Sequence, residues 1–245
     1  MARLLPVDVE NVDTENPAPY VRLKGWLLVS VVAWFLLVAA GLGTLLSYAN
    51  QPGRGGEPAA TWPDATETQY SRSKPTLLVF AHPRCPCTRA TIDELAWIMT
   101  RCGNRVECRV HFVQPLGKSR QWVRSDTWAT ASSIPGVTAL PDREGQLAEL
   151  FGAETSGHAM LYDSLGKLLF EGGITPSRGH RGSNSGREQI VQLAITRQPD
   201  RLLADVDQAD RIDDVDIEST CVFGCPLFSL QRLSATENLH TFRDR

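Results

Sequence analysis

Two cysteines stand one residue apart in the stretch "FAHPRCPCTRAT", at the point where an apolar, strand-like run gives way to a helical pattern. Pro86 lies between them and suits the first position of a helix, because its missing N–H would have no partner there. Cys85 is then the N-cap, and the free N–H groups of Cys87 and Thr88 point toward its sulfur. A helix N-terminus favours an anion, so we expect a lowered pKa and a nucleophilic thiolate at Cys85.

Three interpretations of this Cys-Pro-Cys turn follow from the residues. A disulfide between Cys85 and Cys87 would close a very small ring, and strained disulfides are oxidising and labile. The same two thiols could instead hold a soft metal ion such as copper. Two inert buried thiols are the third interpretation. His82 is close enough in sequence to serve Cys85 as a proton partner, or it is a surface histidine without a role.

The other four cysteines form two further pairs along the chain. Cys102 and Cys108 bracket "GNRVE", and their spacing permits a local structural disulfide. Cys221 and Cys225 lie in "CVFGCPLF" near the C-terminus. These two could pair with each other, or a flexible tail could bring them back to Cys85 as resolving or relay thiols.

An uncharged apolar run over residues 25–48 is long enough to cross a bilayer as a helix. Arg22 and Lys24 flank it on the N-terminal side, so the positive-inside rule predicts a cytoplasmic tail over residues 1–24 and a domain outside the inner membrane, in the periplasm. A cleaved signal peptide ending near Ala49 is the alternative. Both interpretations export the domain to a compartment in which disulfides can persist.

The rest of the chain divides by composition and by its hydrophobic pattern. Residues 49–74 are predicted to form a linker, residues 75–198 a domain, and residues 199–245 an acidic tail that carries the second cysteine pair. Strands and helices alternate in the domain and predict an α/β sheet with helices on its faces. The strands are expected at 76–81, 106–113, 136–140, 158–162 and 167–170, and the helices at 86–102, 119–132, 144–151 and 187–197.

Composition limits the classes of partner. The chain has 245 residues and a formal net charge of −3. Nucleic-acid binders rely on neutralising phosphates with an excess of basic residues. We therefore expect no nucleic-acid partner.

Several motifs together carry a resemblance to a known family. The strand, turn and helix around "VFAHPRCPCT" and the later "MLYDSLGKLLFEGGI" resemble the thioredoxin-like fold of membrane-anchored, TlpA-like proteins. "HPRCPCTRAT", "GGIT" with "GHRGSNSGR", and the terminal "FGCPL" resemble exported bacterial proteins of the RedB type. The resemblance implies a mixed central sheet flanked by helices and a thiol–disulfide oxidoreductase activity. It also implies that the loop carrying His180 borders the cysteine turn.

Two positions depart from the thioredoxin pattern. Thr88 stands where the second active-site cysteine is normally found. Gly157 stands where the fold normally has a cis-proline that faces the cysteines. The sequence "TSGH" therefore predicts a roomier and more flexible loop with His158 nearby, which favours metal binding.

Taken together, the sequence predicts an anchored, exported thiol–disulfide oxidoreductase that acts on protein thiols and disulfides and needs no cofactor. Cys85 attacks and Cys87 resolves in this hypothesis. The alternative is a Sco-like copper protein with Cys85, Cys87 and either His82 or His158 as ligands. A peroxiredoxin-like peroxidase ranks lower, because His82 replaces the Thr or Ser expected three residues before the reactive cysteine. A non-catalytic docking module is the last alternative.

Overall fold

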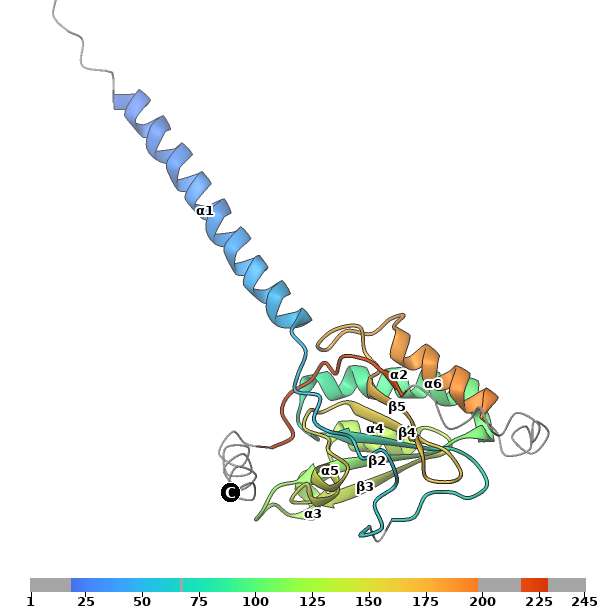
Figure 1. Cartoon of the computed structure of the whole chain (residues 1–245). Coiled ribbons are helices and arrows are strands. Elements are labelled where there is room, and N and C mark those ends of the chain that lie inside the picture. The colour runs from blue at the N-terminus through green and yellow to red at the C-terminus, as the bar shows by residue number, and fades with distance from the viewer. Residues whose placement is uncertain (1–18, 67, 198–216, 229–245) are drawn as a thin grey trace, which may run out of the picture. The chain divides into compact units, whose positions relative to one another are not determined.

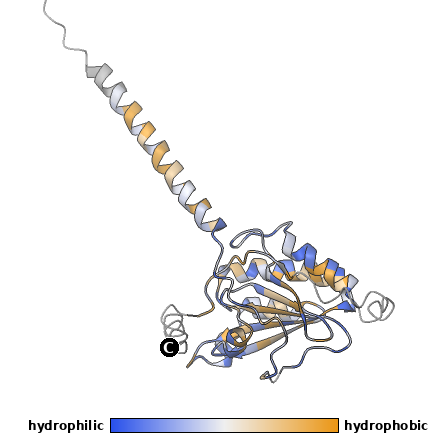
Figure 2. Ribbon diagram, in the orientation of Figure 1, coloured by the Kyte–Doolittle hydropathy of each residue, from blue (hydrophilic) through white to orange (hydrophobic). Residues whose placement is uncertain are grey.

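The computed structural model describes residues 19–66, 68–197 and 217–228. The chain divides into two compact units, Met1–Ser47 and Tyr48–Arg245. Helix α1 (Pro19–Asn50) supplies the described part of the first unit. Its stretch Gly25–Asn50 contains an 18-residue window with a mean hydropathy of 2.3 and is long and apolar enough to cross a membrane (Figure 2). It fits a membrane anchor or a signal sequence.

A six-stranded mixed sheet forms the centre of the second unit, with the order β3-β2-β1-β4-β5-β6 (Figure 1). Strand β1 runs parallel to β2, and β2 runs parallel to β3. Strand β4 is antiparallel to both β1 and β5. This topology confirms the predicted thioredoxin-like fold. The strands are β1 (Thr76–Ala81), β2 (Glu107–Gln114), β3 (Val137–Arg143), β4 (His158–Tyr162), β5 (Leu168–Gly173) and β6 (Glu218–Ser219).

Helices cover the two faces of this sheet because side chains alternate along its strands. Leu77 and Val79 of β1 belong to an apolar core with α2, α4 and α6. Leu78 and Phe80 belong to a second core, on the face that α5 covers. The helices are α2 (Pro86–Cys102), α3 (Arg120–Val123), α4 (Asp126–Ser133), α5 (Gln146–Leu150) and α6 (Ser185–Thr196), with a short 3-10 turn at Gly103–Arg105.

The single helix predicted over residues 119–132 is two helices in the structure. Ser119 caps α3, and Ser125 caps α4 by accepting a hydrogen bond from the backbone N–H of Trp128. A serine at this position favours a new helix start over an uninterrupted helix. The break places Trp122 and Arg124 beside the cysteine turn, where they line a cleft.

The predicted linker and part of the predicted tail pack against the domain, which corrects the boundaries at residues 75 and 198. Trp62 is buried, and its backbone N–H donates a 2.7 Å hydrogen bond to the carbonyl of Gly166. Strand β6 extends the sheet beside β5. Because the stretch after residue 198 is so rich in aspartate, its hydrophobic pattern did not predict these contacts with the domain. Residues 199–216 and 229–245 of the predicted tail, and residues 1–18, lie outside the described residues.

Candidate redox site

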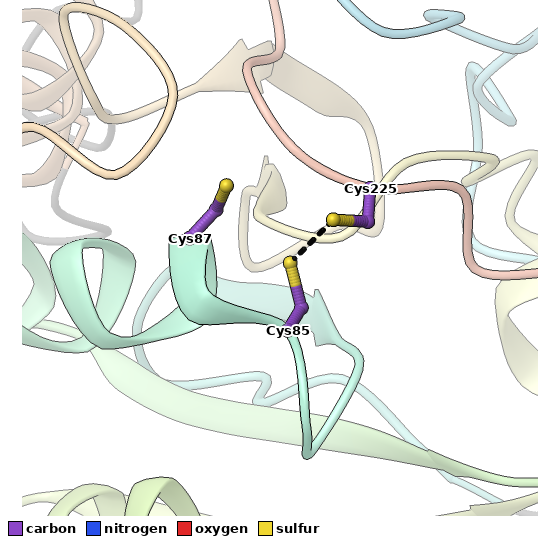
Figure 3. Close-up of side chains that lie close together, drawn as sticks. All are labelled: Cys85, Cys87 and Cys225. Atoms are coloured by element: carbon purple, nitrogen blue, oxygen red, sulfur yellow. Dashed lines mark hydrogen bonds between the residues drawn. The ribbon is translucent and has the colours of Figure 1, made fainter. Parts of the chain in front are cut away.

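Three cysteine sulfurs gather where β1 meets α2. The Sγ atoms of Cys85, Cys87 and Cys225 all lie within 4.8 Å of one another. Cys85 is the N-cap of α2 and Pro86 opens the helix, as the sequence predicts. The Cys85 and Cys225 side chains point toward each other, while Cys87 lies at the start of the helix (Figure 3). Cys85 and Cys225 Sγ are 2.9 Å apart, against about 2.05 Å in a disulfide.

Cys225 arrives at the site on residues 221–228, which we call the C-terminal segment. The backbone N–H of Ser156 donates to the carbonyl of Cys225 at 2.8 Å, and that of Leu227 donates to Glu154 at 2.8 Å. Thr155 and Pro226 form an antiparallel bridge. The segment therefore lies as an added strand along the loop before β4. Cys225 therefore lies beside Cys85, which is one of the two arrangements that the sequence allowed for the cysteines of the tail.

Gly224 allows the C-terminal segment to approach the loop before β4 closely. A Cβ atom at this position would overlap the carbonyl of Ser156. The carbonyl of Gly224 also accepts a hydrogen bond from the guanidinium of Arg178. Only a glycine leaves room for this contact, which holds Cys225 against the turn.

Hydrogen bonding makes Cys85 the most acidic of the three thiols. Burial by itself raises the pKa of Cys85, which is only 5% exposed. The thiol of Cys225 and the backbone amides of Cys225, Cys87 and Thr88 outweigh that effect and bring its pKa below the ordinary value. The Cys85 side chain makes no close capping hydrogen bond, so the α2 amides act on it at longer range. A thiolate at Cys85 accepts from the Cys225 thiol.

The pKa values of the other two thiols are raised. Burial raises the pKa of Cys87, and the neighbouring Cys85 adds to this effect. Burial also raises the pKa of Cys225 to about 12, together with the hydrogen bond to Cys85. Cys85 is therefore the thiol of the three that most readily forms a thiolate, which suits one cysteine to attack and another to resolve.

Thr88 stabilises the site through its hydroxyl. Its Oγ1 donates a 2.9 Å hydrogen bond to the carbonyl of His82 and lies 3.0 Å from Oγ of Ser156. The Ser156 hydroxyl in turn accepts from the backbone N–H of His82 at 2.9 Å. The position that normally holds a second cysteine thus ties the cysteine turn to the loop before β4. Sequence reasoning missed Ser156, and no local signal marks it.

The His82 side chain lies in the cysteine turn, where it contacts Arg84 and Trp122. Its Nδ1 accepts a 3.2 Å hydrogen bond from the backbone N–H of Arg84, and its ring stands edge-on to Trp122. Burial lowers the pKa of His82, and Arg84 adds to the effect. The imidazole is therefore neutral near pH 7 and serves the turn as a hydrogen-bond acceptor.

The loop at Gly157 is tightly packed, which corrects the roomier loop expected from the missing proline. Its backbone N–H donates a 2.7 Å hydrogen bond to the carbonyl of Phe80. Its φ is +95°, and a Cβ atom there would lie 2.9 Å from Oγ1 of Thr91. Thr155 and Ser156 are buried. The C-terminal segment packs against this loop and fills the room that the sequence predicted there.

His158 lies outside the cysteine cluster. It is fully buried at the start of β4, and its Nε2 is 2.9 Å from Oε2 of Glu171. The group of side chains that could hold a metal ion contains Cys85, Cys87 and Cys225 instead. Three thiol ligands suit a soft ion such as Cu(I). His158 is therefore not part of this group, and copper binding stays a prediction.

The glycine-rich loop after β5 borders the site through Arg178 and not through His180. Arg178 contacts the C-terminal segment, and its positive charge partly offsets the rise that burial causes in the pKa of Cys87. His180 is exposed, and its Nδ1 lies 2.8 Å from the carbonyl of Arg178. Glu94 holds the loop on α2, because its carboxylate accepts a 2.6 Å hydrogen bond from the backbone N–H of Gly182.

Cys102 and Cys108 lie at the other end of α2, as expected, and both are completely buried in the core. All six cysteines are free thiols in the structure. Burial raises the pKa of Cys102 to about 11 and raises that of Cys108 further. The disulfide predicted between these two cysteines stays a prediction. Cys221 is exposed.

Neither a family model nor a curated protein matches this chain. The structure is similar to a hypothetical protein of Sinorhizobium meliloti, with a TM-score of 0.45 and 19% identity over 73% of this chain and 96% of the other. A secreted disulfide oxidoreductase of Mycobacterium tuberculosis has a TM-score of 0.35 and 14% identity over 51% of this chain and 82% of its own.

A SCO1/SenC family lipoprotein of Bacillus anthracis is also similar, with a TM-score of 0.43 and 10% identity over 58% of this chain and 97% of its own. Because these TM-scores are low, the fold rests on the strand order itself. The resemblance to RedB-type and TlpA-like proteins stays a prediction.

Proposed function

We propose that this protein is a thiol–disulfide oxidoreductase in which Cys85 is the nucleophile and Cys225 is the resolving cysteine. The observation that carries the proposal is the 2.9 Å contact between their sulfur atoms at the N-terminus of α2. Cys85 is one of the residues that line a cleft, in which a substrate could bind next to it. Cys87 is the third thiol of the cluster.

The exchange proceeds in two balanced steps. The Cys85 thiolate attacks one sulfur of a substrate disulfide, forms a mixed disulfide and releases the other half of the substrate as a thiolate. Cys225 then loses its proton to the solvent and attacks Sγ of Cys85. A Cys85–Cys225 disulfide forms and the second substrate thiolate leaves. The substrate gains two electrons and the protein loses two; the reverse sequence oxidises a dithiol.

Trapping of the mixed disulfide tests the assignment. The reduced full chain in detergent is mixed with a peptide disulfide, quenched with acid and analysed by mass spectrometry. We expect the mixed disulfide to accumulate in Cys225→Ser, because the resolving thiol is gone, and to be transient in Cys87→Ser. Cys85→Ser should form none. Accumulation in Cys87→Ser alone would restore Cys87 as the resolving thiol, and an unreactive Cys85 would refute the function.

We further propose that the protein stays anchored through α1 with its domain outside the cytoplasmic membrane. Support comes from the length and hydropathy of the Gly25–Asn50 stretch and from the basic residues Arg22 and Lys24 before it. Protein thiols and disulfides outside the membrane are then the substrates.

Copper binding is the second candidate function, favoured by the mutual distances of the three sulfurs. Cys85, Cys87 and Cys225 would supply thiolate ligands to Cu(I). Metal analysis of protein purified from cells tests it. Stoichiometric copper that is lost in Cys225→Ser and kept in His158→Ala supports this site. Copper lost in His158→Ala would instead favour the ligand set predicted from the sequence.

A further inference from the structure

Cys85 can be approached from a cleft that the C-terminal segment does not cover. The cleft has a volume of about 490 Å³, and Cys85 and Pro86 form part of its wall. Trp122 and Arg124, on and just after α3, also line it. None of the residues that line it belongs to the C-terminal segment or to the loop before β4. A substrate segment bound in the cleft would therefore lie next to Cys85 without displacing Cys225.

The walls of this cleft carry an excess of positive charge. Arg84, Arg89 and Arg124 line it, and Asp126 is the one acidic residue among its lining residues. All three arginines are exposed, and none of them forms an ion pair with a residue in the part of the chain that the structure describes. Their charges are therefore available to a ligand.

Trp122 orients one of these charges. The guanidinium carbon of Arg84 lies 4.7 Å from the centroid of the Trp122 ring, which is the geometry of a cation–π contact. The contact holds Arg84 between the cysteine turn and α3. A planar guanidinium presents two parallel N–H groups to a carboxylate, which makes arginine suited to such ligands.

We propose that this cleft selects disulfides flanked by carboxylates, and that the substrate is an acidic protein segment carrying its cysteine next to aspartate or glutamate. The proposal rests on the function proposed above and names the substrate class of the same site. An anionic segment would otherwise be repelled by the Cys85 thiolate, and the arginines offset that repulsion. A basic segment is disfavoured by the same charges.

The test compares three symmetric peptide disulfides that differ only in the residues around the cysteine: aspartate, serine or lysine. The reduced full chain in detergent is mixed with each one at low ionic strength. The rate of mixed-disulfide formation is measured by acid quench and mass spectrometry. We expect the aspartate peptide to react at least about tenfold faster than the lysine peptide, and the difference to shrink as salt is added.

Charge reversal on α2 provides a matched pair of variants. Arg89→Glu changes a cleft residue, and Arg101→Glu makes the same charge change in the last turn of the helix, about 18 Å along the axis. Because the ratio of aspartate to serine rates cancels any change in the reactivity of Cys85 itself, that ratio is the readout. It should fall in Arg89→Glu and stay unchanged in Arg101→Glu.

The outcomes separate the two proposals. Equal rates for the three peptides would overturn the selection of acidic substrates and leave the oxidoreductase intact. An equal fall in both variants would also overturn it, because only the overall charge would then matter. Oxidised glutathione is a smaller disulfide that also carries carboxylates. A faster reaction with glutathione than with the aspartate peptide would overturn the proposal that the substrate is a protein segment. A chain that reacts with no peptide refutes both proposals.

Discussion

The backbone N–H of Ser156 donates a 2.8 Å hydrogen bond to the carbonyl of Cys225, across nearly seventy residues of sequence. This bond and the Leu227–Glu154 bond beside it attach the C-terminal segment to the loop before β4. They bring the sulfur of Cys225 within 2.9 Å of that of Cys85. The reactivity of Cys85 therefore depends on a residue 140 positions away in the chain.

The first prediction concerns the acidity of Cys85. Cys225→Ala removes the thiol that donates to the Cys85 thiolate, so the pKa of Cys85 should rise and its reaction with iodoacetamide should shift to higher pH. Cys225→Ser keeps a donor and should shift the profile less. The measurement is the rate of Cys85 alkylation against pH, read by peptide mass spectrometry. An unchanged profile in Cys225→Ala would show that the contact does not stabilise the thiolate.

The second prediction concerns the glycine that replaces the expected proline. Gly157→Ala places a Cβ against Thr91 in a backbone with φ of +95°, and should lower the free energy of unfolding by about 3 kcal/mol. Gly117→Ala is the control, because Gly117 has φ of +74° with nothing near its Cβ position, and should cost about 1 kcal/mol. Urea unfolding of the full chain in detergent measures both. Equal losses would mean that packing at Gly157 does not matter.

The third prediction concerns stability against pH. Burial lowers the pKa of His111 to about 4, and Arg109 adds to the effect. The unfolded chain binds a proton at this histidine below about pH 6.5, while the folded chain does not until about pH 4. Stability from His111 is therefore full above pH 6.5 and falls as the pH decreases toward 4. Between pH 7 and pH 5 the loss is about 2 kcal/mol.

His111→Phe tests this origin. The ring stacks on Phe80 with centroids 5.7 Å apart, and its Nε2 has no hydrogen-bond partner among the described residues, so phenylalanine keeps the contact and removes the titration. The difference in unfolding free energy between pH 7 and pH 5 should be smaller in the variant by that amount. The same pH dependence in both proteins would assign it to other groups.

The fourth prediction concerns topology. A reporter that is active only outside the cytoplasmic membrane should work when fused after Arg245 and fail when fused before Met1, because Arg22 and Lys24 favour a cytoplasmic N-terminus. The N-terminus of the purified protein should be intact. A mature chain that begins near Asn50 would show that the apolar run is a cleaved signal.

The sequence alone determined the local parts of the site. Pro86 after Cys85 was enough to predict the helix start, because proline fits the first turn of a helix and the N-cap then follows. A short apolar run predicted β1 and a helical period predicted α2, since a strand buried on both faces is apolar throughout and a helix buried on one face repeats every 3.6 residues. Asn184 caps α6 in the same local way, by accepting a hydrogen bond from the backbone N–H of Arg187.

Only the tertiary structure decided which residues meet Cys85. The sequence hypothesis favoured Cys87 as its resolving partner, and its copper alternative named His82 or His158 as the third metal ligand. The fold brings Cys225 to 2.9 Å and turns His158 toward Glu171. It also closes the loop at Gly157 and assembles three arginines from two separate segments into one cleft. These contacts join positions far apart in the chain through packing and strand addition, and neither leaves a periodic or spacing signal in the sequence.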